Sequence, residues 1–490
     1  MRIAARFGRG GISLAALMIA VSGTAASADT LRDAFVSVYS SNPTLTGARA
    51  GLRATDEDVG IVRAQGLPDV SATGSYSEFL KRSVNSPSAP IRALYGRADA
   101  TVPLYLGGGV RNQIKAAKAR VEQGRAGLKG TESDIFAQTV AAYMDVLRDL
   151  AIVDLNASNV KVLDTNLQAS RDRFQVGDLT RTDVAQSEAS LAGARAQAES
   201  ARAQLDASRQ TYLEIVGKFP DNLEAPPPLP PLPAMSDDAV DIAVENNPDL
   251  EAARQAAKAA GYDIGTARAL AMPKISAFAN ADYTDYRGTL ARGVLAGGGG
   301  TISQTDKTAT VGVQALLPLY QGGEPAARVR QAKARQSQAI EQATAVERSV
   351  IANVRTAFSR YQASLEVIES SQTAVSANEL ALEGTRAEQG VGTRNLLDVL
   401  NAEQALLNSR STLVTARRDA YVAGFALIAA MGRAQAKDLG LDGGSLYDPV
   451  ANYKRVHGNI FDWDMSPRVK PVAPSTRSQP SVSAVTVPQK

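Results

Sequence analysis

Apolar residues recur every seven positions along two long proline-free stretches of the chain, residues 104–219 and 326–448. Both stretches are rich in Ala, Gln, Arg, Lys and Glu, and a strict seven-residue repeat in such a composition predicts α-helices that coil around partner helices. We expect helices over about 108–175 and 179–218, and again over 323–390 and 394–432. About 65 residues per long helix give a rod of roughly 100 Å. The repeat positions are Val146, Val153, Val160, Leu167 and Phe174, then Val184, Leu191, Ala198, Leu205 and Tyr212, and in the second stretch Tyr361, Ile368, Val375, Leu382 and Gln389, then Val399, Leu406, Leu413 and Ala420.

The two helices of each stretch are joined by a short motif that occurs twice, residues 174–184 and 389–399, at an offset of about 215 residues. Glycine readily adopts the left-handed backbone that ends a helix, and a Thr or Asn beyond it can cap the next helix. Each copy therefore predicts a tight helix–turn–helix, and the chain is predicted to be a tandem duplication. Two unrelated loops that are alike by chance are the alternative. In the alignment of the copies, Val176, Gly177 and Asp183 correspond to Val391, Gly392 and Asp398.

Ahead of each long helix, small apolar residues alternate with polar ones. Val70, Ala72, Gly74 and Tyr76 alternate with serines and threonines, and a similar alternation covers 275–283 and 308–317. A period of two predicts β-hairpins, at about 68–106 and 273–320, with exposed tips at 83–90 and 297–300. Small apolar residues on one face and polar residues on the other are typical of a transmembrane barrel. Amphipathic hairpins packed on a soluble core are the alternative.

A related phrase ends each hairpin, Val-Pro-Leu-Tyr-Leu-Gly-Gly at 102–108 and Leu-Pro-Leu-Tyr-Gln-Gly-Gly at 317–323. A proline removes a hydrogen-bond donor from a strand, and paired glycines let the backbone turn sharply. The phrase therefore predicts the transition from strand to helix, at Pro103, Gly107 and Gly108 in the first copy and Pro318, Gly322 and Gly323 in the second.

Composition narrows the classes of function. Lys and Arg number 53 and Asp and Glu 50, so no strong basic field points to nucleic acid. The chain has no Cys and one His, His457, which excludes disulfides, thiolate metal sites and cysteine nucleophiles. We therefore expect no catalytic site, no cofactor and no metal. The interpretation as an enzyme on a helical stalk has no group of acid, base or nucleophile residues to support it. Aromatic residues make up only 5%, so no bulky central core is expected.

The order of these features suggests the domain organisation. Residues 1–28 have the basic, apolar and A-x-A regions of a secretory signal peptide, and export without cysteine fits a bacterial periplasmic or outer-membrane protein. A first repeat at 29–219 and a second at 237–437 each begin with a helical region that an Asn-Pro pair interrupts, Asn42-Pro43 and Asn247-Pro248. Residues 220–236 form a Pro-rich linker, and 438–490 are expected to be a largely disordered tail.

This duplicated layout of helix, two strands and two helices resembles the TolC family of outer-membrane efflux proteins over roughly residues 30–435. The most specific motifs are Val-Gly-Thr-Arg-Asn-Leu-Leu-Asp-Val-Leu at 391–400, the phrase at 317–323 and the two Asn-Pro sites. The resemblance implies an α+β membrane protein that assembles as a homotrimer. Each chain would give four strands to one twelve-stranded transmembrane β-barrel, which a long α-helical coiled-coil barrel continues across the periplasm.

The same resemblance implies partners and a gate. The partners are further copies of the chain, outer-membrane lipid, a periplasmic adaptor protein and an inner-membrane transporter, either an ABC transporter or a proton-driven pump. The helix turns would lie at the periplasmic tip, where Val176, Gly177, Val391, Gly392 and Thr393 would contact the adaptor. In the family, the Arg at Arg394 ties the inner helix pair to a neighbouring helix, and the Asp at Asp183 is among its partners. The gate and constriction residues so identified are Asp183, Arg394, Asp398, Asn401, Gln389 and Phe174.

This chain departs from the family pattern at two of these positions. Asn401 stands where some members carry a second acidic ring, so a trimer would present three carboxylates from Asp398 rather than six. Gln389 replaces an aromatic residue of the lock, although Phe174 keeps a ring in the first copy. Weaker cation selectivity and a looser tip are therefore expected. For Arg394 and Asp183, helix capping and compensation of the helix dipole are the alternative role.

The sequence thus predicts a passive exit duct of the bacterial outer membrane, serving either type I protein secretion or efflux of small molecules. The absence of a lipid-anchor Cys and the heptad layout lean toward the secretion-type subgroup, by family analogy alone. A periplasmic coiled-coil scaffold without a pore is the alternative from another class.

Overall fold

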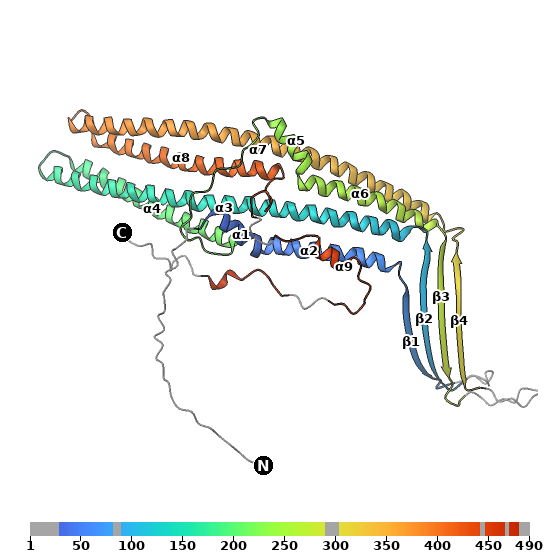
Figure 1. The fold of residues 1–490 in the computed structure, drawn as a ribbon. Helices are drawn as coiled ribbons and strands as arrows, with labels where there is room; N and C mark the ends of the chain where they lie inside the picture. Colours follow the sequence, from blue (N-terminus) through green and yellow to red (C-terminus); the bar gives the residue numbers. More distant parts are fainter. Residues whose placement is uncertain (1–28, 82–89, 290–302, 442–445, 466–469, 480–490) are drawn as a thin grey trace, which may run out of the picture.

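The computed structural model describes residues 29–81, 90–289, 303–441, 446–465 and 470–479 (Figure 1). The predicted signal peptide and most of both predicted hairpin tips lie outside these residues. The chain forms two long helical hairpins that run side by side and a sheet at one end of them (Figure 1). The first hairpin consists of α3 (Gly109–Gln175) and α4 (Arg181–Val216), and the second of α7 (Glu324–Gly390) and α8 (Leu396–Ala430).

The elements of the two predicted repeats follow one another in the same order. Helices α1 (Leu31–Ser41) and α2 (Pro43–Ala64) precede the first hairpin, as α5 (Ser236–Asn246) and α6 (Pro248–Arg268) precede the second. The side chains of Asn42 and Asn247 each accept hydrogen bonds from two backbone N–H groups at the start of the following helix, whose first residue is proline. The two Asn-Pro sites are therefore N-caps, as expected. Between the repeats, residues 224–233 belong to neither a helix nor a strand.

The seven-residue repeat packs the helices of each hairpin together. In the second hairpin one buried cluster contains Val375 and Leu382 of α7 with Val399, Leu406 and Leu413 of α8. In the first, Leu163 and Leu167 of α3 pack on Leu191 and Ala194 of α4. Apolar residues at this spacing form a stripe that faces the partner helix, and their burial drives the pairing. Leu400 of α8 belongs to the cluster of the first hairpin, so the two hairpins also touch each other.

The four strands form one antiparallel sheet in the order β1 (Asp69–Glu78), β2 (Arg92–Leu106), β3 (Lys274–Asp285), β4 (Thr305–Leu316). The register sets Val70 opposite Ala100, Ala100 opposite Ala279, and Ala279 opposite Val311, so the apolar positions of all four strands share one face. The opposite face carries mainly polar residues, as the period of two predicts, together with Tyr95 of β2 and Phe278 of β3. Strands β1 and β4 lie at the two edges of the sheet, and each leaves one side without a partner strand within the described part of the chain.

A central core exists near the middle of the hairpins, contrary to the expectation from the low aromatic content. Phe35 of α1 lies 5.0 Å from Phe136 of α3 and 5.9 Å from Phe425 of α8, measured between ring centroids. Tyr143 and Tyr212 are fully buried beside them. The few aromatic residues are concentrated where α1 and α5 pack across the long helices, and a chain-wide percentage cannot reveal such clustering.

The C-terminal tail is more ordered than predicted. Leu441 belongs to the central core, and helix α9 (Ala451–Val456) packs along α2 (Figure 1). Tyr453 packs against Val59 and Val121, and Val456 is buried. The prediction of a largely disordered tail from residue 438 onward is therefore wrong for these segments, because a few apolar residues fix them to α2 and α3. Farther along, η2 (Thr476–Ser478) is a single short turn, and η1 (Ala269–Ala271) extends α6.

None of the helices in the described ranges has an apolar stretch long enough to cross a membrane.

Candidate functional site at the helix turns

The turns that join α3 to α4 and α7 to α8 lie at the same end of the two hairpins, opposite the sheet (Figure 1). Gly177 and Gly392 have φ values of 83° and 84°, the left-handed conformation predicted for them. Val176 is 79% exposed and Val391 77% exposed, so each turn presents an apolar side chain to its surroundings. The hydroxyl of Thr393 donates to the carbonyl of Glu388 at 2.9 Å and closes the second turn.

Asp183 caps its own helix within the chain. The Thr180 hydroxyl caps the backbone N–H of Asp183 at 3.3 Å, while the Asp183 carboxylate accepts from the Thr180 hydroxyl at 2.7 Å and from the Thr180 backbone N–H at 2.9 Å. This reciprocal capping box begins α4. The hydrogen bonds from Thr180 lower the pKa of Asp183 below its ordinary value. At the same place in the second copy, Asn395 caps α8 by accepting from the N–H of Asp398 at 2.8 Å.

Arg394 pairs with Glu388 across its own turn, with 2.8 Å between Nε and Oε2. This hydrogen bond and the nearby charges of Glu388 and Asp398 raise the pKa of Arg394 above its ordinary value. Both side chains of the pair are about half exposed, so water screens the attraction and the pair adds little stability. Asp183 and Arg394 do not meet within one chain. The predicted link between them would therefore need two neighbouring chains, and it stays a prediction.

The other predicted gate residues lie on the helices next to the turns. Phe174 is 45% exposed at the end of α3, and Asn401 is exposed on α8. Gln389 and Asp398 are partly buried. Their roles in a constriction stay predictions, because a constriction on a threefold axis would be formed by several chains.

A buried carboxylate that the sequence analysis missed lies one and a half turns beyond Asp398 on α8. Glu403 is 5% exposed and accepts hydrogen bonds from Asn166 of α3, at 3.0 and 3.1 Å, and from Arg386 of α7, at 2.9 Å. We call Asn166, Arg386 and Glu403 the tip clamp. A buried carboxylate is stabilised only by such donors, so the clamp ties α8 to both hairpins.

The tip clamp has an exposed counterpart in the first repeat. Arg171 and Glu188 pair at 2.6 Å between α3 and α4, and they occupy the positions that match Arg386 and Glu403 in the second repeat. Both side chains of this first pair are about half exposed. The repeated Arg and Glu positions could have indicated an ion pair in each repeat from the sequence. Only the contact with Asn166, in the other repeat, distinguishes the buried Glu403 from the exposed Glu188.

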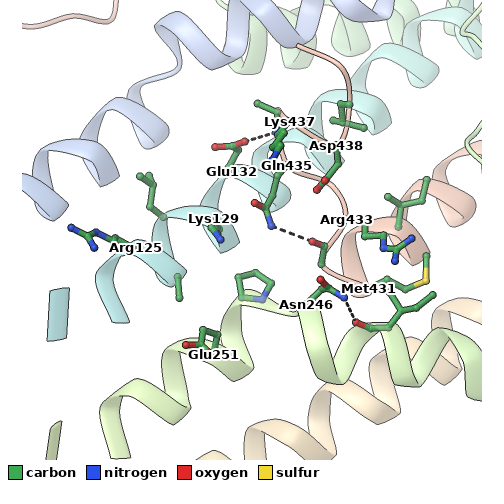
Figure 2. Close-up of a pocket in the computed structure, with 18 of the residues that line it drawn as sticks. Arg125, Lys129, Glu132, Asn246, Glu251, Met431, Arg433, Gln435, Lys437 and Asp438 are labelled. Atoms are coloured by element: carbon green, nitrogen blue, oxygen red, sulfur yellow. Dashed lines mark hydrogen bonds between the residues drawn. The ribbon is translucent and has the colours of Figure 1, made fainter. Parts of the chain in front are cut away.

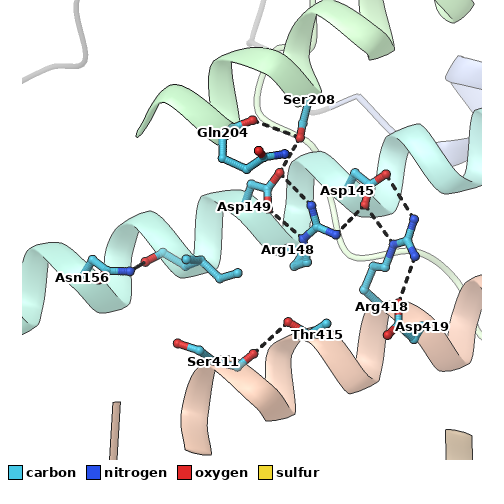
Figure 3. A network of polar contacts seen from close by, with 11 residues as sticks. Asp145, Arg148, Asp149, Asn156, Gln204, Ser208, Ser411, Thr415, Arg418 and Asp419 are labelled. Atoms are coloured by element: carbon cyan, nitrogen blue, oxygen red, sulfur yellow. Dashed lines mark hydrogen bonds and ion pairs between the residues drawn. The ribbon is translucent and has the colours of Figure 1, made fainter. Parts of the chain in front are cut away.

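A second polar tie joins the hairpins nearer their middle (Figure 3). Arg418 of α8 pairs with Asp145 of α3 at 2.9 Å, and Asp145 also pairs with Arg148 at 2.9 Å. Arg148 in turn holds Asp149, which is 2% exposed and accepts a hydrogen bond from Ser208 of α4. We call these five residues the mid-length network. It connects α3, α4 and α8. Asp145 of this network lies 21 residues, or about 31 Å, from Asn166 along α3.

A cavity of about 1360 Å³ lies away from the turns, between α3, the start of α6, the linker and the segment after α8 (Figure 2). Arg125, Lys129 and Arg433 line it together with Glu132 and Glu251. The Glu132 carboxylate accepts from the backbone N–H of Ala436, and burial raises the pKa of Glu132. The lining residues carry charges of both signs, so the cavity favours neither an anionic nor a cationic ligand. Within the described ranges, no group of three or more His, Cys, Asp or Glu side chains is placed to hold a metal ion.

The residues predicted for the transitions from strand to helix lie near the end of β2 and between β4 and α7. The register between β2 and β3 shifts between Pro103 and Tyr105, so the first proline sits at a bulge. Gly107 has φ 64°, and a Cβ at this position would lie 2.5 Å from the Cβ of Met272. Gly108, Gly322 and Gly323 also have positive φ values. Pro318 lies in the extended segment between β4 and α7.

Comparison with known proteins identifies a family and individual proteins that are similar to this chain. Residues 36–218 and 239–433 match the family model described as outer membrane efflux protein. The chain is 34% identical to the outer membrane efflux protein BepC of Brucella suis, over 90% of this chain and 93% of that protein. It is 25% identical to the outer membrane protein TolC of Escherichia coli, over 86% of each. The crystal structure of the Campylobacter jejuni outer membrane channel CmeC superposes with a TM-score of 0.71 at 16% identity, over 88% of this chain and 90% of that one.

Proposed function

The chain belongs to the outer membrane efflux protein family, and from this membership we propose that it is the passive exit duct of a tripartite export system. It is a protein of the bacterial outer membrane that extends into the periplasm. In the proposed assembly three copies enclose one conduit, in which the sheets form a barrel in the membrane and the helical hairpins form a tunnel below it.

The observation that carries this proposal is the sheet with two open edges. An edge strand exposes a row of unpaired N–H and C=O groups, which is unfavourable in lipid unless another strand covers it. Strands β1 and β4 are the two edges, and the apolar face is continuous across the sheet. Pairing β4 of one copy with β1 of the next removes every edge once the ring closes. The scaffold alternative gives no role to this amphipathic sheet.

The tip would then be the gate. Both hairpins of each copy end in an exposed valine beside a left-handed glycine, a shape suited to docking of an adaptor. The tip clamp holds α7 and α8 against α3 in the closed state. An adaptor that binds the turns more tightly in the open arrangement shifts the population toward it, because a ligand moves an equilibrium by its difference in affinity for the two states.

The cargo depends on the cognate transporter. BepC is named an efflux protein, which supports small molecules as cargo, while the absence of cysteine and the heptad layout lean toward protein secretion. Because the chain has no native Cys, a Thr393→Cys variant carries a single thiol at the tip. Crosslinking from it in cells should capture the adaptor of a proton-driven pump in the first case and the adaptor of an ABC exporter in the second.

The duct and the scaffold are separated by fractionation of membranes. A barrel should stay with the outer membrane through washes in high salt and urea, and it should run on gels as a trimer that dissociates on heating. A scaffold should be released by the washes and should migrate as a monomer without heating. Release by salt would contradict the proposal.

A further inference from the structure

The chain has one tryptophan, and it lies in a loop that presents its apolar side chains outward. Residues 459–465, which we call the aromatic loop, follow α9. Phe461 is 76% exposed, Trp463 89% and Met465 77%, and Ile460 beside them is 60% exposed. Four large apolar side chains within six residues make an exposed patch that requires an explanation, whereas single exposed apolar residues do not.

The aromatic loop is a folded turn and not a free end. The Asn459 side chain accepts from the backbone N–H of Phe461 at 3.1 Å and donates to the carboxylate of Asp464 at 2.5 Å. The N–H of Met465 donates to the carbonyl of Trp463 at 3.0 Å. The polar groups of the loop are thus directed at one another, and one of its two carboxylates is held by an amide. Asp462 is exposed between the two rings.

The loop is held at the end of α2 from which the sheet begins. Arg63, in the last turn of α2, donates to the carbonyl of His457 at 3.0 Å. Tyr453 is anchored between α2 and α3, and its ring stacks on that of His457 at 4.9 Å. Helix α2 ends at Ala64 and β1 starts five residues later, at Asp69. The loop therefore leaves α9 at the level where helices give way to strands.

Other exposed aromatic and apolar side chains mark the same level. Tyr105 is 47% exposed at the base of β2, and Leu319 and Tyr320, between β4 and α7, are 89% and 90% exposed. In barrels that span a membrane, aromatic side chains gather at the boundary between lipid and water. Lys454 and Arg455, exposed in the last turn of α9, add positive charge next to the loop, as is usual where a segment meets lipid phosphates.

We propose that the aromatic loop inserts Phe461 and Trp463 into the periplasmic surface of the outer membrane and so fixes the C-terminal segment of each copy to the lipid. This inference rests on the proposed function, which places the sheet in the membrane. The lipid surface would cover the exposed apolar side chains of the aromatic loop. Indole and phenyl rings favour this boundary, while Asp462 and the basic turn of α9 stay in the head-group layer.

Because Trp463 is the only tryptophan, its fluorescence in the unmodified protein reports the loop alone. The trimer is reconstituted in vesicles of phosphatidylethanolamine and phosphatidylglycerol that contain lipids with a nitroxide either near the head group or in the middle of the acyl chain. We expect emission shifted to the blue and quenched more strongly by the nitroxide near the head group. Two variants in a Trp463→Phe background serve as controls, Tyr320→Trp at the base of the sheet and Phe174→Trp at the tip.

Quenching of Trp463 and of the Tyr320→Trp variant, with none for the Phe174→Trp variant, supports the proposal. If Tyr320→Trp is quenched but Trp463 is not, the loop does not meet lipid, and the proposal falls while the proposed function stands. A blue shift of Trp463 without quenching also overturns it, because another copy of the chain then covers the loop. If neither Trp463 nor Tyr320→Trp is quenched, the placement of the sheet in the membrane is itself wrong.

Discussion

Replacing Glu403 by Gln should release the tip more than any change to an exposed ion pair in the hairpins. The carboxylate receives a charge-assisted bond from Asn166, worth about 1.5–3 kcal/mol, and an ion pair from Arg386. The Arg386 side chain is half exposed, which reduces its share to about 0–1 kcal/mol. Together the losses amount to at most roughly 1.5–4 kcal/mol per copy. This free energy favours the arrangement in which α7 and α8 stay against α3.

The loss should act at the tip because of where the clamp lies. Asn166 is nine residues, or about 14 Å, from the end of α3 at Gln175, whereas the mid-length network lies about 31 Å farther back. Without the clamp, the Arg418–Asp145 tie still holds the hairpins together nearer their middle. We therefore expect the ends to separate about this network while the trimer stays intact.

Single-channel conductance in a planar lipid bilayer measures the effect directly. The Glu403→Gln channel should spend more time in states of higher conductance than the unmodified protein, with Asn166→Ala next and Arg386→Ala weaker. Glu188→Gln is the matched control, because it removes the duplicated but exposed pair with Arg171. Equal conductance for Glu403→Gln and Glu188→Gln, with both trimers equally resistant to heat, would mean that the tip clamp does not hold the tip closed.

Three further predictions concern the turns and the cavity. Arg394→Ser should raise conductance if Arg394 reaches a neighbouring chain. Glu388→Gln, which removes only the pair within the turn, should leave conductance unchanged. Unchanged conductance for Arg394→Ser would place the lock elsewhere. Gly392→Ala should destabilise its turn by about 1–2 kcal/mol and speed proteolysis there, because its φ is 84°, while Gly384→Ala inside α7 should stabilise by about 0.5–1 kcal/mol; equal proteolysis would contradict this. Burial raises the pKa of Glu132, so its charged form lowers stability as pH rises through that pKa. Glu132→Gln should therefore raise the thermal midpoint at about pH 8 and not at about pH 4, as followed by circular dichroism.

The sequence was sufficient for those parts of the fold that local patterns determine. The heptads located the four long helices to within a few residues, and the glycines at 177 and 392 located their turns, because helix ends depend on neighbouring residues. The duplication provided a check, since each element had to occur twice. The apolar and polar faces of the strands followed from the period of two.

The parts that depend on contacts between distant segments could not be predicted in this way. Glu403 looks like any charged heptad position until Asn166, 237 residues away, is found to cover it. The ordered tail depends on Tyr453 and Val456 reaching α2, which no local pattern indicates. The predicted partnership of Arg394 with Asp183 depends on neighbouring chains, and it stays a prediction.

In the proposed trimer, β4 of one copy pairs with β1 of the next to close a ring of three. Within one chain these strands are separated by three strand spacings, roughly 14 Å, which is too far for a disulfide. Because the chain has no native Cys, a thiol at Thr73 of β1 can be combined with one at Thr308, Thr310 or Gln314 on the same face of β4. Mild oxidation of at least one pair should give a covalent trimer that survives heating and dissociates on reduction. Monomers alone for every pair, with the thiols still reactive toward maleimide, would contradict the proposed pairing.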